Sequence, residues 1–126
     1  MNARALAQTA YATSRPMIST DRGTEYDIIA RVTRNLATAS QHSETDFASL
    51  ARALQDNREL WTVMAVDLVD PENALPPSLK AQLLSLAHFT EQHIDKVLFN
   101  SADTAILIEI NKSVMRGLIN ERGPIS

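Results

Sequence analysis

The sequence predicts an all-α fold, a single compact bundle of about five helices over residues 1–126. Three observations favour this class. Only three glycines occur in the chain. No segment alternates apolar and polar residues for long enough to form a convincing strand. Apolar residues instead recur at steps of three and four, the spacing that places side chains on one face of an α-helix.

Composition indicates a globular protein without membrane segments. Charged residues make up 21% and hydrophobic residues 44% of the chain, and no apolar run approaches the ~20 residues of a membrane helix. The amino terminus lacks the continuous apolar core of a secretory signal, and cysteine is absent, so we expect a cytoplasmic protein. A net charge of −3 with scattered Lys and Arg argues against direct nucleic-acid binding.

The first predicted helix, from about Ala3 to Ser14, is weak. Its apolar side is narrow and consists of Ala3, Leu6, Ala10 and Tyr11. Pro16 and Gly23 then interrupt any helix. Residues 1–23 are therefore expected to be a mobile helix and linker.

Two longer helices follow. Thr24 and Asp27 resemble a capping box, so the second helix is expected to begin there and to run to about Gln41. The third extends from about Asp46 to Val69, capped by Ser43 or Thr45, and the Asp70-Pro71 pair ends it. The second helix is expected to bury Ile28, Ile29, Val32 and Leu36.

Pro76 and Pro77 are predicted to open the fourth helix, since proline suits the first helical position. The segment before them, DPENALPP, is expected to be a corner with room for one helical turn. The fourth helix turns Leu79, Leu83, Leu86, Ala87, Ile94 and Val97 to one side. The fifth, from Ala102 or Asp103 to about Asn120, is apolar around more than half its circumference, so it is central or has a partner on its second side.

Two asparagines interrupt apolar stripes. Asn57 stands among Leu50, Leu54, Trp61, Met64 and Leu68, and Asn111 among Leu107, Val114 and Leu118. In the simpler interpretation each side-chain amide bonds to a nearby backbone carbonyl or a buried water and only fixes which helices pair. The sharper hypothesis places Asn57 and Asn111 on neighbouring helices in one polar network, with Arg58 or Trp61 close by. Trp61 is then a core residue with its indole N–H bonded, or an anchor at the rim of a client groove.

Catalytic and metal sites are not predicted. No Glu-x-x-His pair of the kind used by carboxylate metal sites in bundles occurs. His88 and His93 are five residues apart, about 140° around a helix, so both are expected to face solvent. Serines lack a histidine in any motif context, and glycine-rich phosphate loops are missing. We therefore expect no enzyme activity and no cofactor.

Four segments together resemble one family. TEYDIIARVTRNL, DNRELWTVMAVDL, DPENALPPSLKAQLLSLA and IEINKSVMRGL are similar, in order and spacing, to FlaF, the flagellar biosynthesis regulator of alphaproteobacteria, over about residues 24 to 119. The linker RPMISTDRG departs from the family in being longer. The matching residues are Thr24, Glu25, Asn57, Arg58, Leu60, Trp61, Asn73, Ala74, Leu75, Pro76, Ile110, Asn111, Gly117 and Leu118.

The resemblance implies a cytoplasmic protein that binds the helical terminal segments of flagellin, aids flagellin secretion and works with a second regulator, FlbT, in controlling flagellin synthesis. An amphipathic client helix needs apolar surface left over from the host's own core, which we expect on the fifth helix and an adjacent face. The amino-terminal helix is expected to cover that groove while the client is absent. The candidate partner-binding residues are Tyr26, Asn57, Trp61, Ile108, Asn111, Met115 and Ile119.

Three alternatives stay open. A regulatory adaptor would act through an FlbT-like partner without holding flagellin. A plain structural bundle would have no apolar patch. A regulator acting directly on mRNA would need a basic surface, which the acidic balance disfavours.

Overall fold

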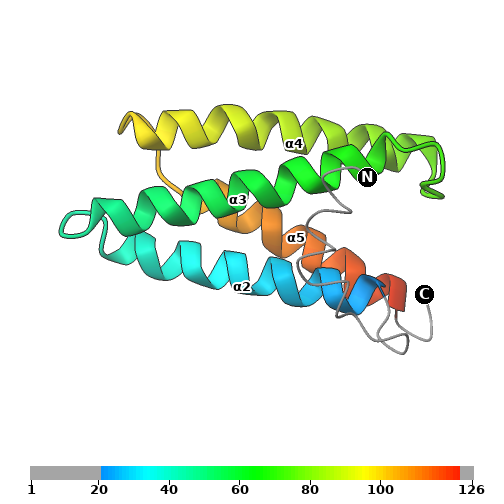
Figure 1. Ribbon diagram of the computed structural model, residues 1–126, viewed down its shortest axis with the longest axis horizontal. Coiled ribbons are helices and arrows are strands. Elements are labelled where there is room, and N and C mark those ends of the chain that lie inside the picture. Colours follow the sequence, from blue (N-terminus) through cyan, green and yellow to red (C-terminus); the bar gives the residue numbers. More distant parts are fainter. Residues whose placement is uncertain (1–20, 123–126) are drawn as a thin grey trace.

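Four α-helices make up residues 21–122, the part of the chain that the computed structural model describes (Figure 1). They are α2 (Asp21–Gln41), α3 (Phe47–Leu68), α4 (Pro77–Leu98) and α5 (Ala105–Arg122). No strand occurs between residues 21 and 122, which confirms the all-α class. The helix predicted over residues 3–14 lies outside the described residues, so the count there is four and not five.

The start of α2 differs from the prediction. The helix begins at Asp21, so Gly23 and Thr24 lie within its first turn and Thr24 is not the N-cap. A single glycine in a helix costs only about 1 kcal/mol relative to alanine. Of the residues predicted to be buried, Ile29, Val32 and Leu36 are buried, whereas Ile28 is only half-buried.

Asp46 is the N-cap of α3, in place of Ser43 or Thr45. Its Oδ1 accepts a hydrogen bond from the Ser49 backbone N–H at 3.1 Å, and its Oδ2 accepts one from the Ser49 hydroxyl at 2.6 Å. These bonds stabilise the carboxylate and hold the pKa of Asp46 below its usual value. Thr45 instead donates its hydroxyl to the His42 carbonyl oxygen within the preceding turn. Asp46 caps the helix because its carboxylate accepts two hydrogen bonds at once, and Asp is among the residues most favoured at the N-cap position.

The proline predictions are confirmed. α3 ends at Leu68, two residues before the Asp70-Pro71 pair, and α4 begins at Pro77 with Pro76 as its N-cap. The corner between them is a turn and contains no helical segment. Asn73 shapes it, since its Oδ1 accepts from the Leu75 N–H and its Nδ2 donates to Asp67 of α3.

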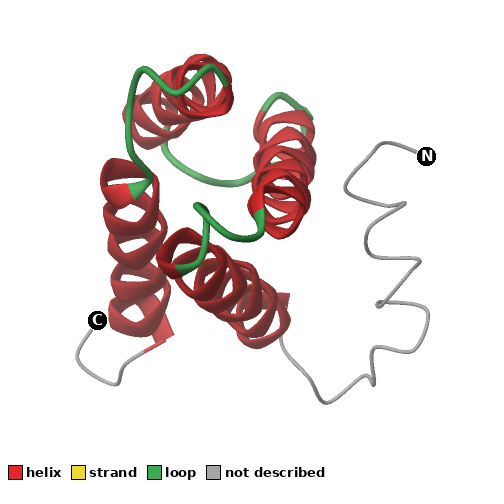
Figure 2. Cartoon of the chain, turned by 90° about the vertical axis from the view of Figure 1, so that its left-hand side faces the viewer, coloured by secondary structure: helices red, strands yellow, loops and turns green. Residues whose placement is uncertain are grey.

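The helices form a bundle in which α2 packs between α3 and α5, and α3 packs between α2 and α4 (Figure 2). α4 and α5 scarcely touch, and α3 and α5 lie diagonally across the bundle. We call the end where α2 and α4 finish and α3 and α5 start the closed end. An apolar cluster fills it, made by Leu36, Ala39, Leu50, Ala53, Leu54, Ile94, Val97 and Leu107.

The opposite end is the open end. There the helices separate into two pairs, α2 with α5 and α3 with α4 (Figure 1). The buried residues of α4, Thr90, Ile94 and Val97, all lie in its closed-end half. Leu83, Leu86 and Ala87, predicted to face the core, are only half-buried, and Leu79 is 36% exposed. The open end therefore leaves apolar surface outside the core. None of the helices among residues 21–122 is both long and apolar enough to cross a bilayer.

Candidate functional site

A pocket of about 120 Å³ lies at the open end. All four helices and the α3–α4 corner contribute to it. Its wall is mostly apolar, with carboxylates and one amide at the edge. The lining residues are Glu25, Ile28, Ile29, Leu60, Trp61, Val63, Met64, Asp67, Leu68, Asn73, Leu75, Leu83 and Val114.

The pocket exists because the helices diverge. Ile29, Trp61 and Leu68 at its inner wall are buried. By contrast, Leu60, Val63, Met64, Leu75, Leu83 and Val114 are half-buried, although each is apolar. With α4 and α5 apart, no element of the described chain covers these side chains. Such half-covered apolar residues are the surface that a further amphipathic element would bury.

Trp61 of the pocket wall belongs to a chain of three buried, hydrogen-bonded side chains. The Trp61 Nε1–H donates to Asn111 Oδ1 at 2.9 Å, and Asn111 Nδ2 donates to Asn57 Oδ1 at 2.7 Å. An indole N–H can only donate, so Asn111 must turn its oxygen to Trp61 and its amide nitrogen to Asn57. Asn57 is 0% and Asn111 1% exposed. We call these three residues the amide chain.

The amide chain confirms the shared network between Asn57 and Asn111, with one correction. The two residues lie on α3 and α5, which are diagonal and not adjacent. Their bond therefore passes through the centre of the bundle. Arg58 takes no part in it, because its side chain turns to the other side of α3.

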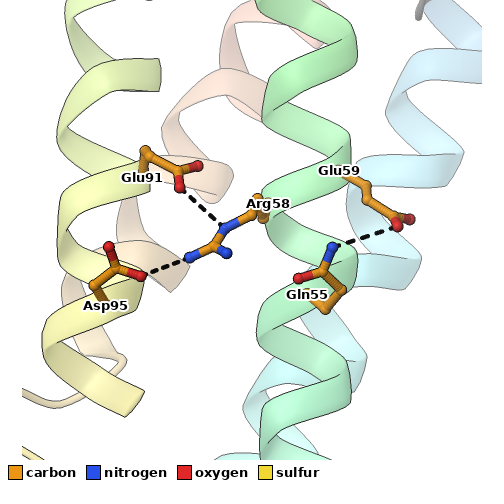
Figure 3. Close-up of polar contacts among 5 residues, drawn as sticks. All are labelled: Gln55, Arg58, Glu59, Glu91 and Asp95. Carbon is orange, nitrogen blue, oxygen red and sulfur yellow. Dashed lines mark hydrogen bonds and ion pairs between the residues drawn. The ribbon is translucent and has the colours of Figure 1, made fainter. Parts of the chain in front are cut away.

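Arg58 instead joins α3 to α4 (Figure 3). Its guanidinium donates to Asp95 at 2.7 Å and lies 3.2 Å from a Glu91 carboxylate oxygen. The Glu91 contact is an ion pair without hydrogen-bond geometry, which is why Arg58 Nε has no hydrogen-bond partner. Both acids are at least half exposed, so water screens these pairs and they contribute at most about 1 kcal/mol.

Each described helix places one buried polar residue near the middle of the bundle. Thr33, Asn57, Thr90 and Asn111 come from α2, α3, α4 and α5, each about two to three turns from the closed end of its helix. Thr33 Oγ1, Asn57 Nδ2 and Thr90 Oγ1 have no protein hydrogen-bond partner. This polar layer separates the apolar cluster at the closed end from the pocket at the open end.

The edge of the pocket is acidic. Glu25 of α2 and Asp67 of α3 line it, and Asp70 and Glu72 follow in the corner. Asp67 accepts from Asn73 at 3.2 Å, and Asp70 accepts from the Glu72 N–H at 2.8 Å. No group of three or more His, Asp or Glu residues placed to hold a metal ion occurs in the described part of the chain.

The predicted partner-binding residues fall into different environments. Asn57, Trp61 and Asn111 are joined in the amide chain, and Trp61 also lines the pocket. Tyr26 and Met115 are half-buried, and Ile108 packs against the apolar cluster at the closed end. The side chain of Ile119 lies outside the described residues. While the bundle is closed, the burial of Asn57 and Asn111 keeps a partner from touching them.

Sequence reasoning missed most of the pocket wall. Met64, Leu68 and Val114 stand in the stripes quoted above, and Leu83 was expected in the core. Leu60 and Leu75 were noted only for their match to the family. The one available signal was the surplus of apolar residues in the fifth helix. It did not show which apolar residues of the neighbouring helices would also be left half-exposed.

His93 was expected to face solvent but is half-buried. Its Nε2 lies 2.9 Å from the Asp103 carbonyl oxygen, and its ring stacks on Phe89 at 5.3 Å between centroids. His88 is exposed as expected. The His93 contacts join the end of α4 to the start of α5, a structural role at the closed end.

Residues 7–118 match the family model described as "Flagellar protein FlaF". The match covers most of the chain, including all the pocket-lining residues and the amide chain. No curated protein and no solved structure matches the chain.

Proposed function

Because the chain belongs to the FlaF family of flagellar proteins, we propose that it is a cytoplasmic chaperone that binds flagellin before secretion and takes part in regulating flagellin synthesis. The open-end pocket receives an amphipathic terminal helix of flagellin. The observation that supports this proposal is the half-buried apolar wall of the pocket, contributed by all four described helices. Secretion requires the client to be held and released unchanged, a task for which a binding groove suffices.

Size suggests how the client helix binds. An engineered cavity of roughly 150 Å³ holds one benzene molecule, so a pocket of about 120 Å³ accepts one large apolar side chain. The rest of the client helix lies across Val63, Leu75 and Leu83, using apolar residues at the i, i+3, i+4 and i+7 positions. Trp61, whose indole is fixed by Asn111, gives the pocket a rigid inner wall.

Substitutions at the two ends of the bundle test the proposal. Leu83→Glu and Val63→Glu place a charge on half-buried positions of the pocket wall. Phe99→Glu is the matched control, since Phe99 is 81% exposed at the closed end. Flagellin binding is measured by the fluorescence of Trp61, the only tryptophan, and by calorimetry. We expect the pocket variants to weaken binding roughly tenfold or more, as for loss of an interface anchor worth about 1.4 kcal/mol.

Circular dichroism of each variant checks that the helices are retained. If Phe99→Glu abolished flagellin binding while both pocket variants bound normally, the pocket would not be the client site. Absence of binding by the wild-type protein at high micromolar flagellin would reject the chaperone function itself.

A second function, that of an adaptor for an FlbT-like regulator, has its own supporting observation. Phe47, which is 50% exposed, lines a larger recess of about 510 Å³ at the closed end, and Phe99, which is 81% exposed, directly precedes Asn100 of the same recess. This surface is separate from the pocket, so one partner can bind at each end. The same Phe99→Glu variant tests it: the adaptor function predicts loss of FlbT binding with flagellin binding retained.

A further inference from the structure

We propose that residues 1–20 of the same chain occupy the open-end pocket when no client is bound. The segment thereby competes with flagellin for the same apolar wall. The inference rests on the proposed function for its biological role, but docking of the segment is testable without flagellin. Its anchors are the two large apolar side chains of the predicted first helix, Leu6 and Tyr11.

Chain geometry brings the segment to the pocket. The described chain begins at Asp21, and Glu25, Ile28 and Ile29 in the first turns of α2 line the pocket. Glu25 is only about 6 Å along the helix axis from Asp21. The point at which residues 1–20 are attached therefore lies close to the edge of the pocket.

Charge favours the same placement. The first 20 residues contain Arg4 and Arg15 and no Asp or Glu. The pocket edge carries Glu25 and Asp67, with Asp70 and Glu72 in the corner beside them. Glu25, Asp67 and Asp70 also interact with other groups. Only their negative charge is needed to attract a segment whose net charge is positive.

The extent of the family match adds a third argument. It begins at residue 7, fourteen residues before α2, so residues 7–20 belong to the unit that the family model describes. A segment that is part of this unit is expected to have a place in the fold. The pocket is the apolar surface next to its point of attachment.

A tethered segment need not bind tightly. A short flexible linker gives an effective concentration in the millimolar range, so an intrinsic affinity of the same order fills the pocket about half of the time. Flagellin must then displace the segment, and its apparent Kd rises by the inverse of the fraction of open pockets. A segment that is bound half of the time raises the flagellin Kd about twofold, and one bound nine-tenths of the time about tenfold.

The first experiment uses the full chain, whose lack of cysteine allows a single labelled position. A nitroxide is attached at Thr9→Cys, and the broadening of methyl NMR signals is measured. We expect broadening of Ile28, Val63, Leu75 and Val114 at the pocket, and none of Leu50 and Val97 at the closed end. A nitroxide at Thr38→Cys, an exposed position near the end of α2, is the control and should affect the closed end instead.

The second experiment repeats the Thr9→Cys measurement in a double variant that carries Leu6→Glu and Tyr11→Glu. These substitutions should abolish the broadening at the pocket and lower the flagellin Kd. They leave every described residue unchanged. Absence of broadening at the pocket, or equal broadening at both ends, would overturn the inference. If flagellin then bound the wild type and the double variant equally, the chaperone proposal would survive alone. If broadening occurred but flagellin did not bind or reverse it, docking would stand and the chaperone proposal would fail.

Discussion

At the scale of residues, the three members of the amide chain have unequal importance. Asn111 bonds in both directions, accepting from Trp61 and donating to Asn57. Asn57 accepts one bond, and its own Nδ2 has no protein partner. A buried polar group that loses its partner costs about 1–3 kcal/mol, whereas removal of an already unpaired group can be favourable. The residue in the middle of the chain should therefore be the hardest to replace.

Leucine substitutions test this order. Asn111→Leu leaves both the Trp61 N–H and Asn57 Oδ1 without partners, so we expect a loss of roughly 2–5 kcal/mol in unfolding free energy. Asn57→Leu leaves only Asn111 Nδ2 unpaired and removes one unpaired donor, so we expect a loss of about 0–2 kcal/mol. Urea denaturation measures both. The double variant should be less damaging than Asn111→Leu alone, because only the Trp61 N–H is then orphaned; equal losses for the two single variants would contradict this account.

The amide chain also shows how far sequence reasoning reaches at this scale. Two asparagines at core positions of helical stripes were enough to predict a shared network, because a buried amide must find a partner. The diagonal relation of α3 and α5 was not predictable, since the stripes specify which face is buried and not which helix lies opposite. The direction of each bond likewise depends on Trp61, whose donor-only indole is placed by the tertiary fold.

At the scale of elements, the helix ends depend on single residues. α4 ends in a Schellman motif, in which the Ser101 N–H donates to the Lys96 carbonyl at 2.8 Å and the Asn100 N–H to the Val97 carbonyl at 2.9 Å. Asn100 has φ of 62°, the left-handed conformation that glycine adopts without cost and asparagine tolerates. Polar residues and prolines in the sequence predicted where most helices stop. The predicted start of α2 was wrong because one glycine in a helix costs only about 1 kcal/mol and so does not by itself prevent a helix.

A matched pair of substitutions tests the Asn100 conformation. Asn100→Gly removes the steric cost of positive φ but adds chain entropy to the unfolded state, so we expect a gain of up to about 1 kcal/mol. Asn100→Ala keeps a Cβ without the local hydrogen bonding of asparagine, so we expect a loss of about 1 kcal/mol. Thermal unfolding should rank the variants glycine, wild type, alanine. A more stable alanine variant would show that the left-handed turn does not form.

At the scale of the whole molecule, the two ends of the bundle differ in how much of their apolar surface is covered. The closed end buries a continuous cluster from all four described helices. The open end leaves Met64, Leu83 and Val114 half-buried around the pocket. Helical periodicity predicted the apolar faces, but every turn of such a face looks alike in sequence. The divergence of α4 from α5 decides which turns become core and which become pocket, and no local pattern records it.

Because the open end buries less of its apolar surface than the closed end, we expect its local stability to be lower. Hydrogen exchange can measure this difference. Regions with few buried contacts open at lower free energy than the core. Amides of α3 near Met64 and of α4 near Leu83 should therefore exchange faster than those near Leu54 and Ile94 in the cluster. Bound flagellin should slow exchange at the open end most, since a ligand stabilises the state to which it binds. Global unfolding would expose both ends of the bundle together. If the amides exchanged at a uniform rate along α3 and α4, both with and without flagellin, the open end would not be a separate binding unit.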